Sequence, residues 1–151
     1  YIIPLVLVLV GLWLGWLILS GMLHLGSTLL GGRGSMQGAL NVVGWAYLPF
    51  AVRDILRVVF MLIAGHAIVS PGLSGFASSP GFVAEILSHI DLFYLWSTVM
   101  LIIGFGISDG LSKGKSITGV ILILLVLLLI QAGLGTLISN IGGLASQNPI
   151  F

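Results

Sequence analysis

The stretch that most invites a chemical interpretation is Gly110–Ser116, which is rich in glycine and lysine and invites comparison with a phosphate-binding loop. Such loops read Gly-x-x-x-x-Gly-Lys-Ser/Thr after a strand, because their backbone N–H groups and lysine hold phosphate oxygens. Here Asp109 occupies the first glycine position, the spacing is one residue short, and no strand precedes it. We therefore interpret the stretch as a tight turn whose lysines, Lys113 and Lys115, lie at lipid headgroups.

A second polar cluster consists of Arg53, Asp54 and Arg57. Residues three and four apart share a helix face, so the two arginines align and Asp54 can pair with Arg57. One interpretation is a contact to anionic headgroups or to a partner subunit. The other, which we favour, is topology anchoring with an internal ion pair, because charges at the ends of membrane spans usually reach toward water.

The remaining polar groups in apolar surroundings are isolated. His24 and His66 are expected near opposite membrane faces, so they cannot share a metal ion, and Asn41 and Gln131 have no charged partner in the sequence. No His-Glu-x-x-His spacing occurs, and the chain has no cysteine. We predict no catalytic residue, cofactor or metal, and hence no enzyme.

The composition indicates the kind of protein in which these polar side chains lie. Hydrophobic residues make up 58% of the 151-residue chain and charged residues only 6%, against roughly 25% charged in soluble domains. This small number of charges cannot cover a protein surface that is exposed to water. We therefore expect the lipid bilayer to surround the chain as its partner. The net charge of +1 gives no field that would attract nucleic acid.

The apolar runs predict an all-α, polytopic transmembrane bundle, because backbone groups in lipid must bond within their own helix. Each span needs about 20 apolar residues. We expect a single membrane domain over residues 1–151, with a fifth span before residue 1. The predicted segments are spans at about 3–28, 48–69, 91–108 and 117–138, an interfacial helix at about 35–47 and an outer loop at 70–90.

Residues 36–69 allow two interpretations. As one helix they would measure about 50 Å, which exceeds the bilayer's apolar core of about 30 Å. Pro49 lies in the middle, and proline suits the first turn of a helix rather than its interior. We prefer an interfacial helix followed by a span that begins near Pro49. The alternative is one long, kinked helix.

The basic residues give an orientation. With four alternating spans, all of them fall on one side, which the positive-inside rule makes cytoplasmic. Tyr1 and Phe151 then both lie outside, and we expect a prokaryotic cytoplasmic membrane. The basic residues are Arg33, Arg53, Arg57, Lys113 and Lys115.

Small residues in the spans predict close helix packing. Gly11 and Gly15 form a small-x-x-x-small face on the first span, and Gly104 and Gly106 lie in the third. Together with Pro49 they either pack the bundle internally or dock another membrane subunit. Both roles need the same small residues, so the sequence leaves both open.

Several motifs together resemble the Yip family of Rab/Ypt-interacting membrane proteins and its prokaryotic relatives. Residues 29–35 read Leu-Leu-Gly-Gly-Arg-Gly-Ser, and residues 42–49 read Val-Val-Gly-Trp-Ala-Tyr-Leu-Pro. Residues 91–96 read Asp-Leu-Phe-Tyr-Leu-Trp, and Ile103-Gly104 and the Gly110–Ser116 turn follow. In this order and spacing the motifs extend over most of residues 10–130.

The resemblance implies five helices, a cytoplasmic N-terminus and an outer C-terminus. It also implies that eukaryotic members act in vesicle trafficking and contact Rab GTPases, partly through an acidic, aromatic cytosolic segment that this sequence lacks. Our leading hypothesis is a non-catalytic membrane subunit that scaffolds or regulates a larger assembly with other membrane proteins. The alternatives are a trafficking or membrane-shaping factor and a small transporter or channel component, and no ligand class follows from the sequence.

Overall fold

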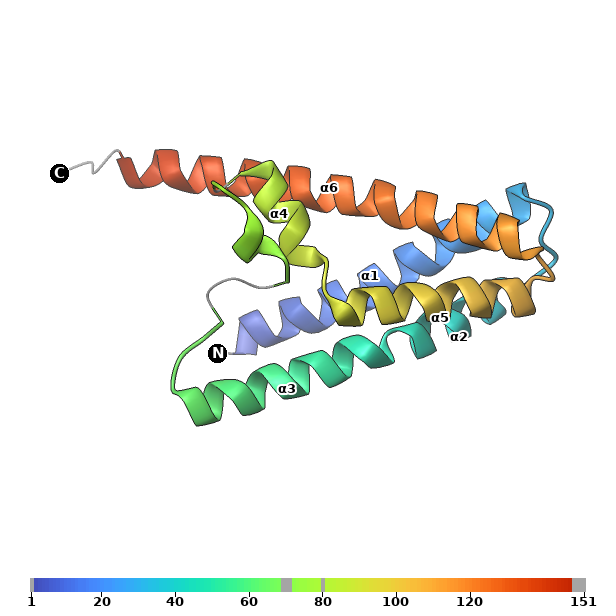
Figure 1. Cartoon of the computed structure of the whole chain (residues 1–151), viewed down its shortest axis with the longest axis horizontal. Helices are drawn as coiled ribbons and strands as arrows, with labels where there is room; N and C mark the ends of the chain where they lie inside the picture. The colour runs from blue at the N-terminus through green and yellow to red at the C-terminus, as the bar shows by residue number, and fades with distance from the viewer. Residues whose placement is uncertain (1, 69–71, 80, 148–151) are drawn as a thin grey trace.

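The computed structural model describes residues 2–68, 72–79 and 81–147, with side chains through residue 140. The regular elements of this part of the chain are all helices, which confirms the predicted all-α class. Tyr1 and Phe151, whose side of the membrane we predicted, lie outside the described residues. The elements are α1 (Ile2–Leu29), α2 (Met36–Ala46), α3 (Leu48–Ala64), η1 (Ser74–Phe76), α4 (Phe82–His89), α5 (Leu92–Ser108) and α6 (Lys113–Gln147) (Figure 1).

The long helices lie side by side in alternating directions (Figure 1). α1 packs on α2 and α6, and α5 packs on α2, α3 and α6. The core therefore lies where the C-terminal half of α1 meets α2, α5 and the first half of α6. Its most deeply buried large side chains include Leu23, Val43, Leu101 and Phe105. The N-terminal half of α1 and most of α3 lie outside this core and expose apolar side chains.

α2 and α3 form one helical run that bends at Tyr47, which ends α2 and precedes α3. Pro49 lies in the first turn of α3, where its missing N–H has no helical partner to lose. α2 packs between α1 and α5, with Ala39 and Val43 fully buried. The sequence allowed an interfacial helix at about 35–47 or one long, kinked helix, and the structure shows two consecutive helices of which α2 packs within the bundle.

The described residues contain fewer candidate spans than we predicted. α1 and the Lys113–Asn140 part of α6 are long and apolar enough to cross a bilayer, and α4 with α5 makes a third if that bent pair is one span. The run of α2 and α3 is not among these candidates, and the middle of the 17-residue helix α3 carries three charged side chains. The count is thus two to three rather than four, and the fifth predicted span lies before the described residues.

α4 meets α5 at an angle of 65°. This short helix lies in the predicted outer loop, whose residues 69–71 and 80 are outside the described part. It packs on α6, where a Cβ on Gly135 would lie 2.6 Å from the Glu85 carboxylate. Asp91 begins α5 by accepting a hydrogen bond from the backbone N–H of Tyr94 at 2.8 Å. The bend thus carries the chain from the side of α6 into the centre of the bundle.

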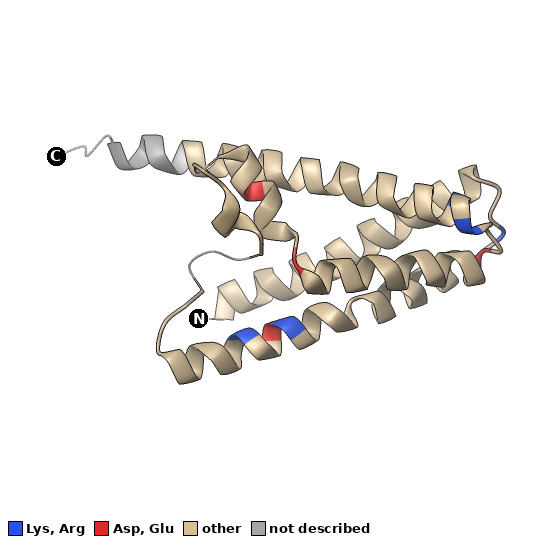
Figure 2. Cartoon of the chain, in the orientation of Figure 1, with Lys and Arg blue, Asp and Glu red and all other residues tan. Residues whose placement is uncertain are grey.

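Charged side chains gather at the two ends of α5 (Figure 2). The 17 residues of α5 measure about 26 Å, close to the roughly 30 Å of a bilayer's apolar core. We call the group at the start of α5 the ion-pair cluster, and it comprises Arg53, Asp54, Arg57 and Asp91. We call the group at its other end the basic turn cluster, and it comprises Arg33, Asp109, Lys113 and Lys115.

The structure does not gather the five basic residues at one end of the bundle, as the predicted orientation assumed. Because the helical run starts at Met36 rather than near Pro49, Arg53 and Arg57 lie well along it, in the middle of α3, beside Asp91 at the start of α5. Three basic residues remain at the opposite end. The alternation of the helices therefore stands, and the one-sided charge distribution does not.

Candidate functional site

Hydrogen bonds to Asp109 connect the turn after α1 to the turn after α5. The hydroxyl of Ser27 donates a short hydrogen bond to one oxygen of this carboxylate, and the Ser108 hydroxyl donates to the other at 2.9 Å. The backbone N–H of Arg33 donates to the carbonyl oxygen of Asp109 at 3.0 Å. Only 3% of Asp109 is exposed. These bonds satisfy a buried carboxylate that would otherwise be costly.

Gly34 makes this close approach feasible. A Cβ at this position would overlap the Asp109 carboxylate, so any larger residue would push the two turns apart. The motifs at 29–35 and 110–116, which are 75 or more residues apart, therefore meet around one buried acid. In the sequence, Asp109 stands out only as the residue that breaks a phosphate-loop motif. An Asp-Gly pair after an apolar run signals a turn, but nothing in the sequence shows that its side chain is buried.

Lys115 has a structural contact in addition to the headgroup contact that we predicted. Its Nζ donates to the carbonyl oxygen of Leu30 at 2.7 Å, just past the end of α1. A cation there complements the negative end of the helix dipole and one of its free carbonyl groups. Ser116 follows and donates to the carbonyl oxygen of Ile102 at 2.6 Å, which joins α6 to α5. Arg33 and Lys113 are exposed.

The ion-pair cluster connects α3 to the start of α5. Nη1 of Arg53 lies 3.3 Å from the Asp91 carboxylate, and its Nε lies 3.1 Å from Asp54. Arg57 lies farther away, 3.7 Å from Asp54 and 3.8 Å from Asp91. The predicted pair of Asp54 and Arg57 thus exists, but Asp91 was missed. An aspartate directly before an apolar run signals a helix start. The sequence does not reveal that Asp91 pairs with Arg53, which lies 38 residues earlier in the chain.

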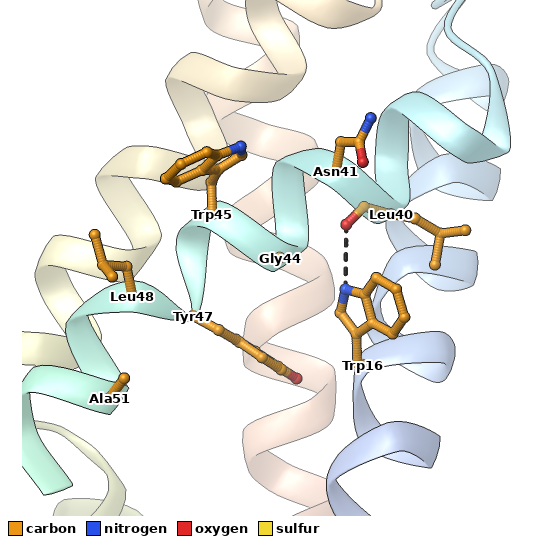
Figure 3. Close-up of a pocket in the computed structure, with 8 residues that line it drawn as sticks. All are labelled: Trp16, Leu40, Asn41, Gly44, Trp45, Tyr47, Leu48 and Ala51. Atoms are coloured by element: carbon orange, nitrogen blue, oxygen red, sulfur yellow. Dashed lines mark hydrogen bonds between the residues drawn. The ribbon is translucent and has the colours of Figure 1, made fainter.

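An open pocket of about 470 Å³ lies at the bend between α2 and α3, beside α1 (Figure 3). The indole N–H of Trp16 donates to the carbonyl oxygen of Leu40 at 3.1 Å and fixes this edge of the pocket. Asn41 and Tyr47 add polar groups to an otherwise apolar lining, which holds no charged residue. Such a pocket suits an apolar group better than a charged substrate.

The glycines predicted to pack helices differ in their surroundings. A Cβ on Gly104 would lie 2.5 Å from Val42 Cγ1, so α5 and α2 approach closely there. Gly106 faces Ser116 at an ordinary contact distance of 3.6 Å. By contrast, a Cβ on Gly11 or Gly15 would meet no atom within 4 Å.

The histidines do not form a site in the described part of the chain. No three His, Asp, Glu or Cys side chains come close enough there to hold a metal ion. His66 bonds the neighbouring carbonyl of Ala67 at 3.1 Å, and His89 that of Glu85 at 2.8 Å. The Nδ1 of His24 is buried without a hydrogen-bond partner. His66 and His89 therefore contact separate local groups, and the three imidazoles do not converge on one site.

A bundle of apolar helices whose charged clusters lie about one bilayer thickness apart defines an integral membrane protein. A family model for the Yip1 domain matches residues 1–135, which include α2, α3, α4 and α5 entirely. The chain therefore belongs to the Yip1 domain family, and the match confirms the resemblance that the motifs predicted. No curated protein and no solved structure matches the chain.

Proposed function

We propose that this chain is a non-catalytic membrane subunit that scaffolds or regulates a larger membrane assembly. The observation that carries the proposal is the open glycine face of α1. Gly11 and Gly15 contact no other helix in the described chain, whereas Gly104 is packed against α2. Small residues four apart let two membrane helices approach closely. A helix of another subunit on this face would account for two glycines that each cost helix stability.

The polar groups support a role without catalysis. The Asp109 carboxylate is occupied by two hydroxyl groups, and Asp91 and Asp54 are paired with arginines. Catalysis would need a nucleophile and base, or an acid and base, converging on a space for substrate. The pocket at the bend of α2 and α3 is lined by no carboxylate, imidazole or amine, and the phenol of Tyr47 is the one titratable group in its lining.

The proposal is tested by purifying the full chain in a mild detergent and measuring its mass by native mass spectrometry. We expect a partner subunit at a fixed ratio, and we expect that G11L/G15L loses it because leucines hold the helices apart. The matched control is V6L/L9F, on the opposite side of α1 by helical periodicity. A monomeric wild-type chain without a partner, or equal loss in both variants, would contradict the proposal.

Membership of the Yip1 domain family favours one second candidate, a trafficking or membrane-shaping factor. The family resemblance implies that eukaryotic members contact Rab GTPases. This function predicts that the purified chain retains Rab-type GTPases in one nucleotide state. Absence of binding to a panel of such GTPases, loaded with GDP or GTP, would exclude it.

We also propose that the basic turn cluster faces the cytoplasm of a cell membrane. Three of the five basic residues lie at this end, and the positive-inside rule depends on basic residues in short loops. The charge difference that supports this orientation is smaller than the sequence alone implied, because Arg53 and Arg57 lie at the other end of the bundle, beside Asp91.

A further inference from the structure

The two ends of the bundle differ in the charge that they leave uncompensated. At the start of α5, two arginines face two aspartates within 4 Å, so this cluster is neutral. At the other end, three cations accompany one acid. Every ion pair within 4 Å in the described part of the chain belongs to the ion-pair cluster. The basic turn cluster therefore keeps an excess of two positive charges.

The single acid of the basic turn cluster is poorly placed to neutralise these cations. Asp109 is 97% buried, and its two oxygens accept hydrogen bonds from Ser27 and Ser108. Arg33 and Lys113 are exposed and make no ion pair with a described residue. Their charges are thus available to an external anion.

The position of the cluster identifies the anion. Lys113 is the first residue of α6, whose Lys113–Asn140 segment is a candidate span, and Arg33 follows the other long candidate, α1. Cations directly beside the end of an apolar helix lie at the depth of lipid phosphates. The opposite cluster lies about 26 Å away, near the other leaflet.

From these charges and this position, we infer that Arg33 and Lys113, assisted by Lys115, bind the headgroups of anionic phospholipids in the leaflet at this end. The ion-pair cluster does not, although sequence analysis grouped both sets as equivalent headgroup contacts. The inference is independent of a partner on α1, because it concerns different residues at the end of the bundle.

The test compares lipid binding by the full chain in detergent containing equal phosphatidylglycerol and phosphatidylcholine, read by native mass spectrometry. We expect the wild type to retain phosphatidylglycerol preferentially. R33Q and K113Q should each lower this preference about fivefold, the effect expected for one cation at an anionic membrane surface. Added salt should weaken the preference, since exposed charges are screened.

R57Q is the matched control, because it removes one cation from the neutral cluster at the other leaflet. Helicity and melting temperature of each variant establish that it is folded. Lys115 is left unchanged, since it also bonds Leu30. An equal loss in R57Q, no loss in folded R33Q and K113Q, or a wild type without lipid preference would overturn the inference. If the chain retained an acidic protein but showed no lipid preference, the inference would be overturned and the anion would belong to a protein partner.

Discussion

At the scale of single residues, the chain uses its few acids to join helices. At one end of the bundle, Asp109 joins the turns after α1 and α5. At the other end, Asp91 caps the start of α5 and forms an ion pair with Arg53. Neither role requires a base or a nucleophile. In a chain with 6% charged residues, each such contact is a large share of the polar interactions that specify the packing of otherwise similar apolar helices.

The first prediction concerns Gly34. We expect G34A to destabilise the fold by about 1–3 kcal/mol, the usual cost of overpacking, because the new methyl group would overlap the Asp109 carboxylate. Reversible unfolding in mixed micelles, followed by helicity, measures this change. G114A is the control, because a Cβ there meets no atom within 4 Å. Equal stability of G34A and the wild type would show that the turns are not in close contact.

The second prediction separates the two roles of Asp91. D91N keeps a side chain that can start the helix but removes the charge that pairs with the mostly buried Arg53, so we expect a loss of about 1–3 kcal/mol. D91A removes both roles and should cost about 1 kcal/mol more. The same unfolding measurement compares them. Equal losses in the two variants would mean that the hydrogen bond to Tyr94 contributes nothing.

At the scale of elements, the sequence predicted helices well and their environment less well. The predicted spans at 3–28 and 91–108 lie close to α1 and α5, because unbroken apolar runs determine where membrane helices form. The sequence leaves the environment of residues 35–47 open, because Pro49 marks a helix start without showing whether another helix continues into it. Only packing against α1 and α5 reveals that α2 belongs to the bundle.

The candidate sites were predictable to a similar degree. Arg33 and Lys113 were identified because basic residues in short turns stand out in an apolar chain. The difference between them and Arg53 was not predictable, since it depends on Asp91, which is distant in sequence. The open face at Gly11 and Gly15 was likewise indistinguishable from the packed Gly104 until neighbouring helices were in place.

The third prediction tests the contact between α2 and α5. G104A should destabilise the protein by about 1–3 kcal/mol, because its methyl group would lie 2.5 Å from Val42 Cγ1. V42A makes room, so G104A/V42A should lose less than the sum of the single variants, the mark of a direct contact. G133A, which meets no atom within 4 Å, is the control. Strictly additive losses would contradict this packing.

At the scale of the whole molecule, the charged residues lie at two ends of the bundle. The turns after α1 and α5 lie at one end, and α4 with the ion-pair cluster lies toward the other (Figure 2). This geometry differs from the orientation inferred from sequence in one respect that is open to measurement, the side on which Arg53, Asp54 and Arg57 lie.

The fourth prediction uses the absence of cysteine in the chain. S35C and S112C should react with a membrane-impermeant maleimide from the same side of sealed vesicles, and D54C and S79C from the opposite side. Asp54 is suitable because 62% of its side chain is exposed. Labelling of D54C from the same side as S112C would restore the orientation with all basic residues together.

The late position of Asp91 has a consequence for biosynthesis. The run of α2 and α3 does not meet the criteria for a membrane span by itself, and its Arg53 finds a carboxylate 38 residues later in the chain. Until α5 emerges, Arg53 and Arg57 share the single carboxylate of Asp54, and transfer of an incompletely paired arginine into lipid is costly. We therefore expect α1 to insert as soon as it is synthesised. The run of α2 and α3 should remain at the insertion machinery until α5 has emerged, and should then enter the bilayer together with α5.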